Sequence, residues 1–203
     1  MVTCAALVDA MAGRRVHRCH VDGLVSPAPG KVAFGPAATM RCLPRRADLL
    51  DPGRHDFVPL FREAVGADPR GKVLVIAAEG YPGESVAGGK KLTRLETAGC
   101  SGLVTDGSLR DFAGLAEMSF SAWCSGETVR WAGDNLMPYE AGVPVELRGV
   151  TVLPGDWVYA DASGVAVIPA GDVAAVLEEA VRIEERDARV IARIREDAAR
   201  GDG

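Results

Sequence analysis

The middle of the chain alternates between two kinds of hydrophobic pattern. Uninterrupted apolar runs are typical of strands buried on both faces, whereas apolar residues three or four positions apart are typical of helices. The patterns predict strands at residues 72–78, 102–107 and 120–124, and helices over residues 92–98 and 110–118. The order strand, helix, strand, helix, strand predicts a parallel sheet with crossover helices. The expected fold class is therefore α/β.

Other elements are expected on either side of this region. Before it, residues 3–12 and 57–65 have helical spacing, and residues 30–42 are β-like, with Gly35-Pro36 interrupting two short apolar runs. After it, apolar runs alternate with Pro-Gly and Ser-Gly pairs between residues 143 and 168. Short runs bounded by such turn residues predict antiparallel strands.

The C-terminal segment, residues 171–200, is predicted to form a charged helix with one apolar stripe. The stripe consists of Val173, Val176, Leu177, Ala180, Ile183, Val190, Ile191 and Ile194. We expect this helix to pack on the body at its beginning and to extend into solvent, or onto a neighbouring subunit, further along. Because the sequence contains no internal repeat and no low-complexity linker, we interpret residues 1–203 as a single domain.

Composition narrows the class of protein. Of the 203 residues, 48% are hydrophobic and 25% are charged, as in globular domains with a sizeable core. Lys and Arg total 23 against 28 Asp and Glu, and the net charge of −5 argues against a nucleic-acid partner. No apolar run is long enough for a membrane span, and the N-terminus lacks a secretory pattern. Five scattered cysteines without a CxxC pair indicate reduced thiols, so a cytoplasmic location is expected.

The first candidate site is the glycine-rich loop at residues 79–91, between the first buried strand and its helix. Ligands of open α/β sheets bind beyond the carboxyl ends of the strands. Gly88 and Gly89 would let a ligand approach the backbone, and Lys90 and Lys91 add positive charge before a helix N-terminus that favours anions. The loop is thus a candidate substrate-binding site for an anion. The alternative interpretation is a flexible loop with solvated lysines.

The second candidate site, residues 106–111, follows the next buried strand. Arg110 offers a fork of donors that suits a carboxylate. Asp111 suits a divalent metal or a water molecule. An isolated Arg-Asp pair is equally compatible with a surface ion pair or with the start of a helix.

The two candidates stand at a fixed spacing, since Arg110 follows Gly89 by 21 positions and one helix and one strand lie between them. Further characteristic segments are Gly99-Cys100-Ser101-Gly102, Asp106-Gly107, Gly35–Thr39, Val152–Asp156 and Ala160–Pro169. With these motifs the chain resembles the RraA-like family (regulator of ribonuclease E activity A), which includes divalent-metal-dependent 4-hydroxy-4-methyl-2-oxoglutarate aldolases. The resemblance covers nearly the whole chain.

This resemblance implies a swivelling β/β/α domain that assembles as a homotrimer or a hexamer, with sites between subunits. In the family's aldolases, an arginine binds the substrate carboxylate and the following aspartate binds Mg²⁺ or Mn²⁺. In the family's pattern an acidic residue is followed by twenty residues and then by Arg-Asp. That acidic residue holds the metal's waters, and the backbone amides of the two residues after it contact the substrate carboxylate. Carried over to this sequence, these roles fall on Arg110, Asp111, position 89, and the amides of Lys90 and Lys91.

Position 89 departs from the family's pattern because it is glycine, and two lysines follow it where the aldolases carry apolar residues. One carboxylate fewer and two ammonium groups more should weaken the binding of Mg²⁺ or Mn²⁺ at Asp111. Three outcomes follow: a lysine replaces the metal in stabilising an enolate, a lysine forms a Schiff base, or the site only binds. Glu79 or Glu84 would be another source of the missing carboxylate.

The leading hypothesis is a lyase that cleaves a carbon–carbon bond of a small 2-oxo acid or related carboxylate. Retro-aldol cleavage and β-decarboxylation both leave an enolate beside a carboxylate, so one site serves either reaction. Arg110 would hold the carboxylate, Asp111 would position a metal, water or proton, and Lys90 and Lys91 would supply positive charge. The alternative is a non-catalytic protein that binds and regulates a partner, as the family's ribonuclease inhibitors do.

Overall fold

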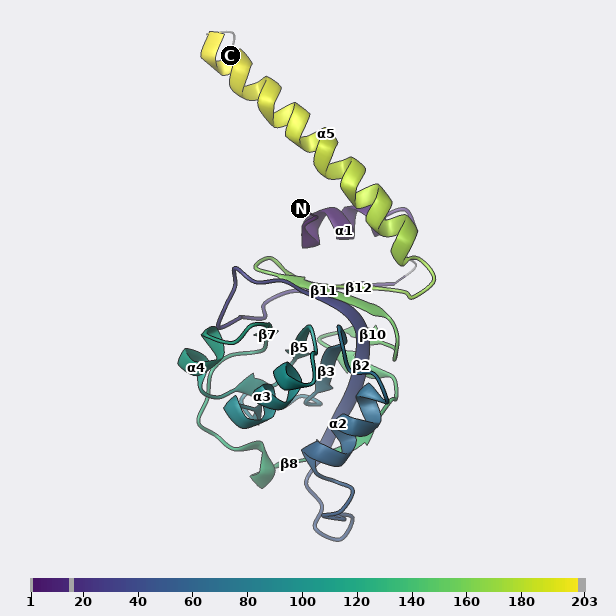
Figure 1. The fold of residues 1–203 in the computed structure, drawn as a ribbon, viewed down its shortest axis with the longest axis vertical. Helices are drawn as coiled ribbons and strands as arrows, with labels where there is room; N and C mark the ends of the chain where they lie inside the picture. The colour runs from purple at the N-terminus through teal and green to yellow at the C-terminus, as the bar shows by residue number, and fades with distance from the viewer. Residues whose placement is uncertain (1, 15–16, 201–203) are drawn as a thin grey trace.

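The computed structural model describes residues 2–14 and 17–200, and it is built around one mixed sheet with helices on its outside (Figure 1). The sheet has the order β1-β12-β11-β2-β3-β5-β7, and β8 also pairs with β2. Its strands are β1 (His20–Val21), β2 (Ala33–Pro44), β3 (Val73–Ala77), β5 (Gly102–Thr105), β7 (Ser121–Trp123), β8 (Leu136–Ala141), β11 (Trp157–Asp161) and β12 (Gly164–Ile168).

One half of this sheet is parallel. Strands β2, β3, β5 and β7 run in the same direction, and β3, β5 and β7 are buried along their whole length. The connections between them contain the helices α2 (Phe57–Val65), α3 (Gly89–Thr97) and α4 (Phe112–Ala116). The parallel sheet with crossover helices expected from the sequence is confirmed.

Strand β2 joins the parallel half to an antiparallel half. Its first residues pair antiparallel with β11, and from Ala37 onward it pairs parallel with β3. A Cβ atom on Gly35 would lie 1.8 Å from the carbonyl oxygen of Gly71, so only glycine fits at this point. The Gly35-Pro36 pair therefore marks a change of pairing partner within one continuous strand, instead of the gap between two runs expected from the sequence.

The remaining strands form small pairs around the sheet. Strands β9 (Val145–Leu147) and β10 (Val150–Val152) form an antiparallel hairpin, as do β11 and β12, which confirms the antiparallel prediction. Two very short strands, β4 (Ser85–Ala87) and β6 (Ser108–Leu109), pair parallel to each other outside the main sheet. The sequence did not predict this second pair.

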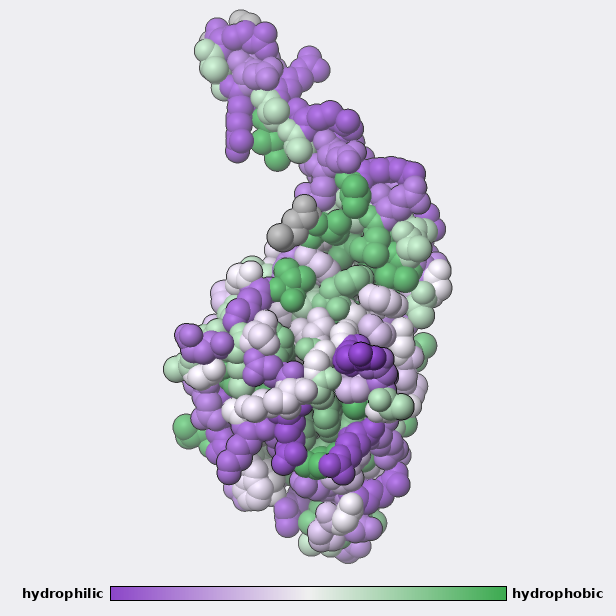
Figure 2. All heavy atoms as spheres, viewed as in Figure 1, coloured by the Kyte–Doolittle hydropathy of each residue, from purple (hydrophilic) through white to green (hydrophobic). Residues whose placement is uncertain are grey.

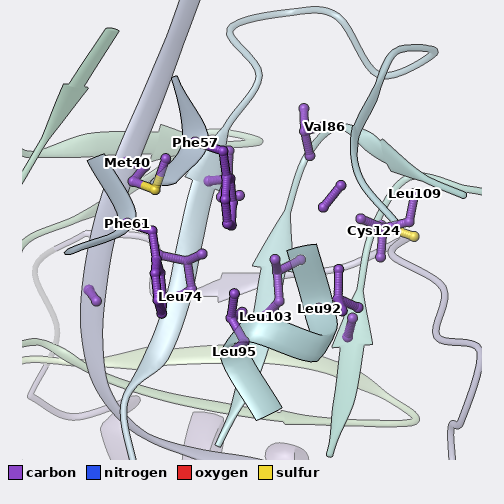
Figure 3. Close-up of a cluster of buried hydrophobic side chains, with 14 of the residues drawn as sticks. Met40, Phe57, Phe61, Leu74, Val86, Leu92, Leu95, Leu103, Leu109 and Cys124 are labelled. Atoms are coloured by element: carbon purple, nitrogen blue, oxygen red, sulfur yellow. The ribbon is translucent and has the colours of Figure 1, made fainter. Parts of the chain in front are cut away.

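The largest hydrophobic cluster fills the space between the parallel strands and helices α2, α3 and α4 (Figure 3). Phe61 of α2 lies beside Leu74 of β3 and stacks on Phe57, and Leu95 of α3 lies close to Leu103 of β5. Removing this apolar surface from water fixes α3 on the sheet. The loop at the beginning of α3 is thereby held at the carboxyl end of β3.

Helix α5 (Val173–Arg200) leaves the body after its first ten or so residues, which pack against α1 (Cys4–Met11). Hydrophobic residues gather where these helices meet the body, and the far end of α5 is mostly hydrophilic (Figure 2). Ile183 is 6% exposed, whereas Ile194 is 61% exposed. No helix in the described part of the chain is long and apolar enough to cross a membrane. The contact of α5 with a neighbouring subunit stays a prediction.

Replacing a buried isoleucine of α5 should affect stability far more than replacing an exposed one. Ile183→Ala should lower the free energy of unfolding by about 2–4 kcal/mol, because a cavity opens beneath the helix. Ile194→Ala is the matched control and should change it by less than about 0.5 kcal/mol. Chemical denaturation of both variants checks this. An equally large loss for Ile194→Ala would show that the distal half of α5 is buried in solution, as in the predicted oligomer.

Candidate functional site

Two strand-end loops meet at one edge of the molecule. Strands β4 and β6 pair parallel with one irregularity: Ser85 lies opposite Ser108 and Ala87 lies opposite Leu109. The N–H of Arg110 also donates to the carbonyl of Ala87 at 3.0 Å. Helix α3 begins at Gly89 immediately after β4, and helix α4 begins at Phe112 shortly after β6. The pairing of these two short strands therefore places the two candidate sequences next to each other.

The two loops enclose a cavity of about 260 Å³. Its lining consists of Ser85, Val86, Ala87, Gly88, Gly89, Lys90, Lys91, Arg110, Asp111 and Trp131. Every residue singled out from the sequence as a substrate or catalytic residue lines this cavity. The structure thus brings together residues that are about 20 positions apart in the chain.

Asp111 connects the two loops directly. Its Oδ2 accepts a hydrogen bond from the N–H of Gly89 at 3.1 Å, at the start of α3. Asp111 has a φ of +70°, a left-handed conformation that aspartate adopts more readily than most residues. A Cβ atom on Gly89 would lie 3.6 Å from Asp111 Oδ2, which is ordinary contact. A side chain at position 89 would therefore lie next to the Asp111 carboxylate.

Lys90 and Lys91 are not equivalent. Lys90 is exposed to solvent, whereas Lys91 Nζ donates to the carbonyl of Val86 at 2.8 Å and lies 4.8 Å from the centre of the Phe57 ring. Burial lowers the pKa of Lys91 below its ordinary value, because a charged ammonium is poorly solvated there. Nearby Cys42 and Asp56 partly oppose this shift. Of the two lysines, Lys91 therefore has its ammonium held in one position at the edge of the cavity.

Arg110 is exposed at the cavity and keeps its charge available. No carboxylate in the described part of the chain forms an ion pair with it, although Asp111 is its neighbour. Asp111 instead uses one carboxylate oxygen for the Gly89 amide. Three cationic side chains and one carboxylate thus surround the cavity, which favours an anionic ligand.

The carboxylates considered as replacements for position 89 lie outside this cavity. Glu79 is exposed in the turn after β3, at a φ of +50°. Glu84 is buried, and its Oε1 accepts from Asn135 Nδ2 at 2.8 Å and lies 3.6 Å from Arg130 Nη1. Neither lines the cavity. The charge of Glu84 is used to hold the segment that follows β7.

Sequence reasoning missed Trp131 as a residue of the site. Trp131 precedes the short helix η1 (Ala132–Asp134) and is 55% exposed while lining the cavity. A Cβ atom on Gly133 would lie 2.3 Å from the Trp131 ring, so the ring lies directly over this glycine and would have to move for any larger residue. The sequence shows only a tryptophan two residues before a glycine, and that pattern does not place Trp131 beside Arg110.

Relatives of known name match about two thirds of the chain. A Halalkalibacterium halodurans protein named as a 4-hydroxy-4-methyl-2-oxoglutarate aldolase is 35% identical over 132 residues, which is 65% of this chain and 62% of that protein. The chain therefore spans less than two thirds of the length of this relative. A Burkholderia mallei (strain SAVP1) protein of the same name is 33% identical over 133 residues, covering 66% of this chain and 73% of that protein.

Solved structures and a family model agree with these relatives. The crystal structure of Streptomyces coelicolor RraAS2, described as an unusual member of the RNase ES inhibitor RraA protein family, has a TM-score of 0.82 at 27% identity. It covers 95% of this chain and 93% of that one. The family model for RraA-like proteins, described as Aldolase/RraA, matches residues 4–167. Since that match includes both loops of the cavity and most of the chain, the protein belongs to the RraA-like family.

Proposed function

We propose that this protein is a carbon–carbon lyase that acts on a small 2-oxo acid by retro-aldol cleavage or β-decarboxylation. The observation that carries the proposal is the unpaired Arg110 beside Lys91 and Asp111 in one cavity. Relatives that are 33–35% identical are named as aldolases, which supports the same reaction class. Both reactions need a group for the carboxylate and a group for the developing enolate.

Arg110 binds the substrate carboxylate in this proposal. Its guanidinium presents two parallel donors to a carboxylate, and the first turn of α3 adds the positive end of a helix dipole. The backbone amides contribute less to binding of the carboxylate than the sequence suggested. The Lys91 N–H donates to the Gly88 carbonyl at 3.0 Å, and the Gly89 N–H is used by Asp111. The side chain of Arg110 therefore supplies most of the attraction.

Lys91 stabilises the enolate. Its ammonium is fixed by the Val86 carbonyl and the Phe57 ring, so it needs little reorganisation during the reaction. Charge interactions are stronger where water is excluded than in bulk solvent, and Lys91 is the more desolvated of the two lysines. Lys90 contributes at longer range from the solvent side. Asp111 keeps one carboxylate oxygen for a water molecule or for the proton of a substrate hydroxyl.

The residues present do not fit Mg²⁺ or Mn²⁺ well. In the described part of the chain, no three His, Cys, Asp or Glu side chains are grouped closely enough to hold a metal ion, and Asp111 is the only carboxylate lining the cavity. Hard divalent cations prefer several oxygen ligands, and the three cations around Asp111 repel another. The proposed reaction therefore relies on the protein's own side chains.

A second candidate function is the binding and regulation of a partner without catalysis. Gly89 favours it, because the family's acidic residue is missing while the anion-binding groups remain. The likeness to RraAS2 points in the same direction. The absence of turnover of 2-oxo acids, with and without added metal, in a protein that still binds them would favour this function over the lyase.

Arg110→Ala should weaken the binding of pyruvate and oxalate by about 2 kcal/mol or more, because a charge-assisted two-donor contact is lost. Arg110→Lys should recover little of it, since a point charge lacks the fork. Isothermal titration calorimetry measures both. Arg94→Ala is the matched control, because Arg94 is exposed on the last turn of α3 and does not line the cavity. Unchanged affinity in Arg110→Ala would place the carboxylate elsewhere.

Restoring the acid should create a metal site. The variant Gly89→Asp/Lys90→Leu/Lys91→Leu should bind Mn²⁺ at least roughly tenfold more tightly than the wild type, because it adds a carboxylate next to Asp111 and removes two positive charges. The matched control carries Gly83→Asp with the same lysine changes, since Gly83 lies in the exposed preceding loop outside the cavity. Tight Mn²⁺ binding by the wild type that Asp111→Asn abolishes would contradict the metal-poor site.

Activity should survive exhaustive chelation with EDTA, and Lys91→Ala should lose far more of it than Lys90→Ala.

If the ammonium is required, kcat falls as pH rises through the lowered pKa of Lys91, below the ordinary 10.5, because deprotonation removes the charge. A required neutral amine would give the opposite slope. If Lys91 acts through its charge, borohydride reduction in the presence of substrate should leave it unmodified. A trapped adduct on Lys91 would show a Schiff base in place of the electrostatic role.

A further inference from the structure

A second cavity of about 310 Å³ lies between α2, β2 and β8. Its lining is largely apolar and includes Met40 of β2, Phe57 of α2, Ile76 of β3 and Leu136 and Met137 of β8. All five of these side chains are buried. Neither the carboxylate-binding role of Arg110 nor the charge of Lys91 accounts for an apolar space of this size.

The two cavities are adjacent because they share a wall. Val86, Lys91 and Trp131 line both of them. The Lys91 ammonium lies over the Phe57 ring, which lines the apolar cavity, while the same residue borders the cavity of Arg110. A ligand whose carboxylate binds Arg110 reaches the apolar cavity only by passing these three side chains, of which Trp131 is 55% exposed.

The polar groups around the apolar cavity are held by the chain itself or lie near its rim. Arg45 is exposed, and its Nη1 donates to the Gly133 carbonyl at 2.8 Å. The Nδ1 of His55 accepts from the N–H of Asp51 at 3.0 Å. Asp56 is exposed and carries the wrong sign for an anion. Lys91 also borders this cavity, but its ammonium already donates to the Val86 carbonyl and is the group that faces the enolate in the proposed reaction. A second carboxylate among the apolar side chains would therefore be desolvated without a cation of its own.

We propose that the apolar cavity receives the alkyl or aryl group of a 2-oxo acid whose carboxylate binds Arg110. This inference rests on the proposed function and names its substrate class: 4-hydroxy-2-oxo acids that carry an apolar substituent and no second carboxylate. Retro-aldol cleavage of such an adduct gives a carbonyl compound and a monocarboxylic 2-oxo acid, and that acid binds as the product. The relatives are named for a substrate with a second carboxylate. The apolar lining of the second cavity favours a substrate with an apolar group over one with a second carboxylate.

A series of 2-oxo acids tests the inference on the full-length wild-type protein. Pyruvate, 2-oxobutanoate, 4-methyl-2-oxopentanoate and phenylpyruvate share the carboxylate and differ in the apolar group, and 2-oxoglutarate carries a second carboxylate. Calorimetry should show affinity rising about three- to fourfold for each buried methylene. Phenylpyruvate should bind at least tenfold more tightly than pyruvate, and 2-oxoglutarate no more tightly than pyruvate.

A cavity-filling variant locates the apolar group. Ala132 is buried and lines the apolar cavity but not the cavity of Arg110. Ala132→Leu should remove the preference for larger acids and leave pyruvate binding unchanged, which also shows that the variant is folded. Ala67→Leu is the matched control, because Ala67 is exposed in the loop after α2 and lines neither cavity. It should keep the wild-type series.

The outcomes separate this inference from the proposed function. If no 2-oxo acid binds in an Arg110-dependent manner, the proposed function fails and the inference fails with it. If pyruvate binds through Arg110 but the series is flat, or 2-oxoglutarate binds most tightly, the inference is overturned while the proposed function stands. A preference for phenylpyruvate that Ala132→Leu does not change would place the apolar group elsewhere and overturn it as well.

Discussion

The site depends on the contact between two loops, which several hydrogen bonds hold together. The Gly89 amide donates to Asp111 Oδ2, and the short β4–β6 pairing brings the two residues into reach. Asp111 contacts the backbone at the beginning of α3 and, with glycine at position 89, faces no second carboxylate there. The large cluster beneath α3 keeps that helix end in place. The position of Arg110 follows, because it immediately precedes Asp111 and is bonded to Ala87 through its own amide.

The charge balance of the cavity follows from the same glycine. An acidic residue at position 89 would lie beside Asp111, and two carboxylates in contact would need a cation between them. With glycine there, one carboxylate is bonded to an amide and the neighbouring cations attract an anion. Lys91 differs from Lys90 because its ammonium turns back over Phe57, where burial lowers its pKa. Two consecutive residues of one helix thus have different electrostatic properties.

The sequence predicted what depends on local pattern. The buried apolar runs predicted the parallel strands, and the Pro-Gly and Ser-Gly turns predicted the antiparallel region. The two loops were assigned to one site through the resemblance to the RraA-like family, which the spacing of Gly89 and Arg110 helps to carry. It did not predict the β4–β6 pairing, because strands of two or three residues leave no periodicity. It could not separate Lys90 from Lys91, since only packing decides which side chain meets Phe57. It missed Trp131, whose place depends on a chain segment that crosses from β7 to β8.

The shared wall couples the two cavities. Lys91 borders a polar cavity that contains Arg110 and Asp111, and it also borders a largely apolar cavity whose lining includes methionine, leucine and phenylalanine. The aliphatic stem of a lysine can pack on apolar surface while its ammonium stays at a polar boundary. An apolar group bound beside Lys91 would exclude more water from the ammonium and strengthen its attraction for a developing enolate. Lys91 would then take part both in recognising the substrate's apolar end and in stabilising its reacting end. The apolar substituent of the substrate would therefore affect the rate of the reaction as well as the affinity.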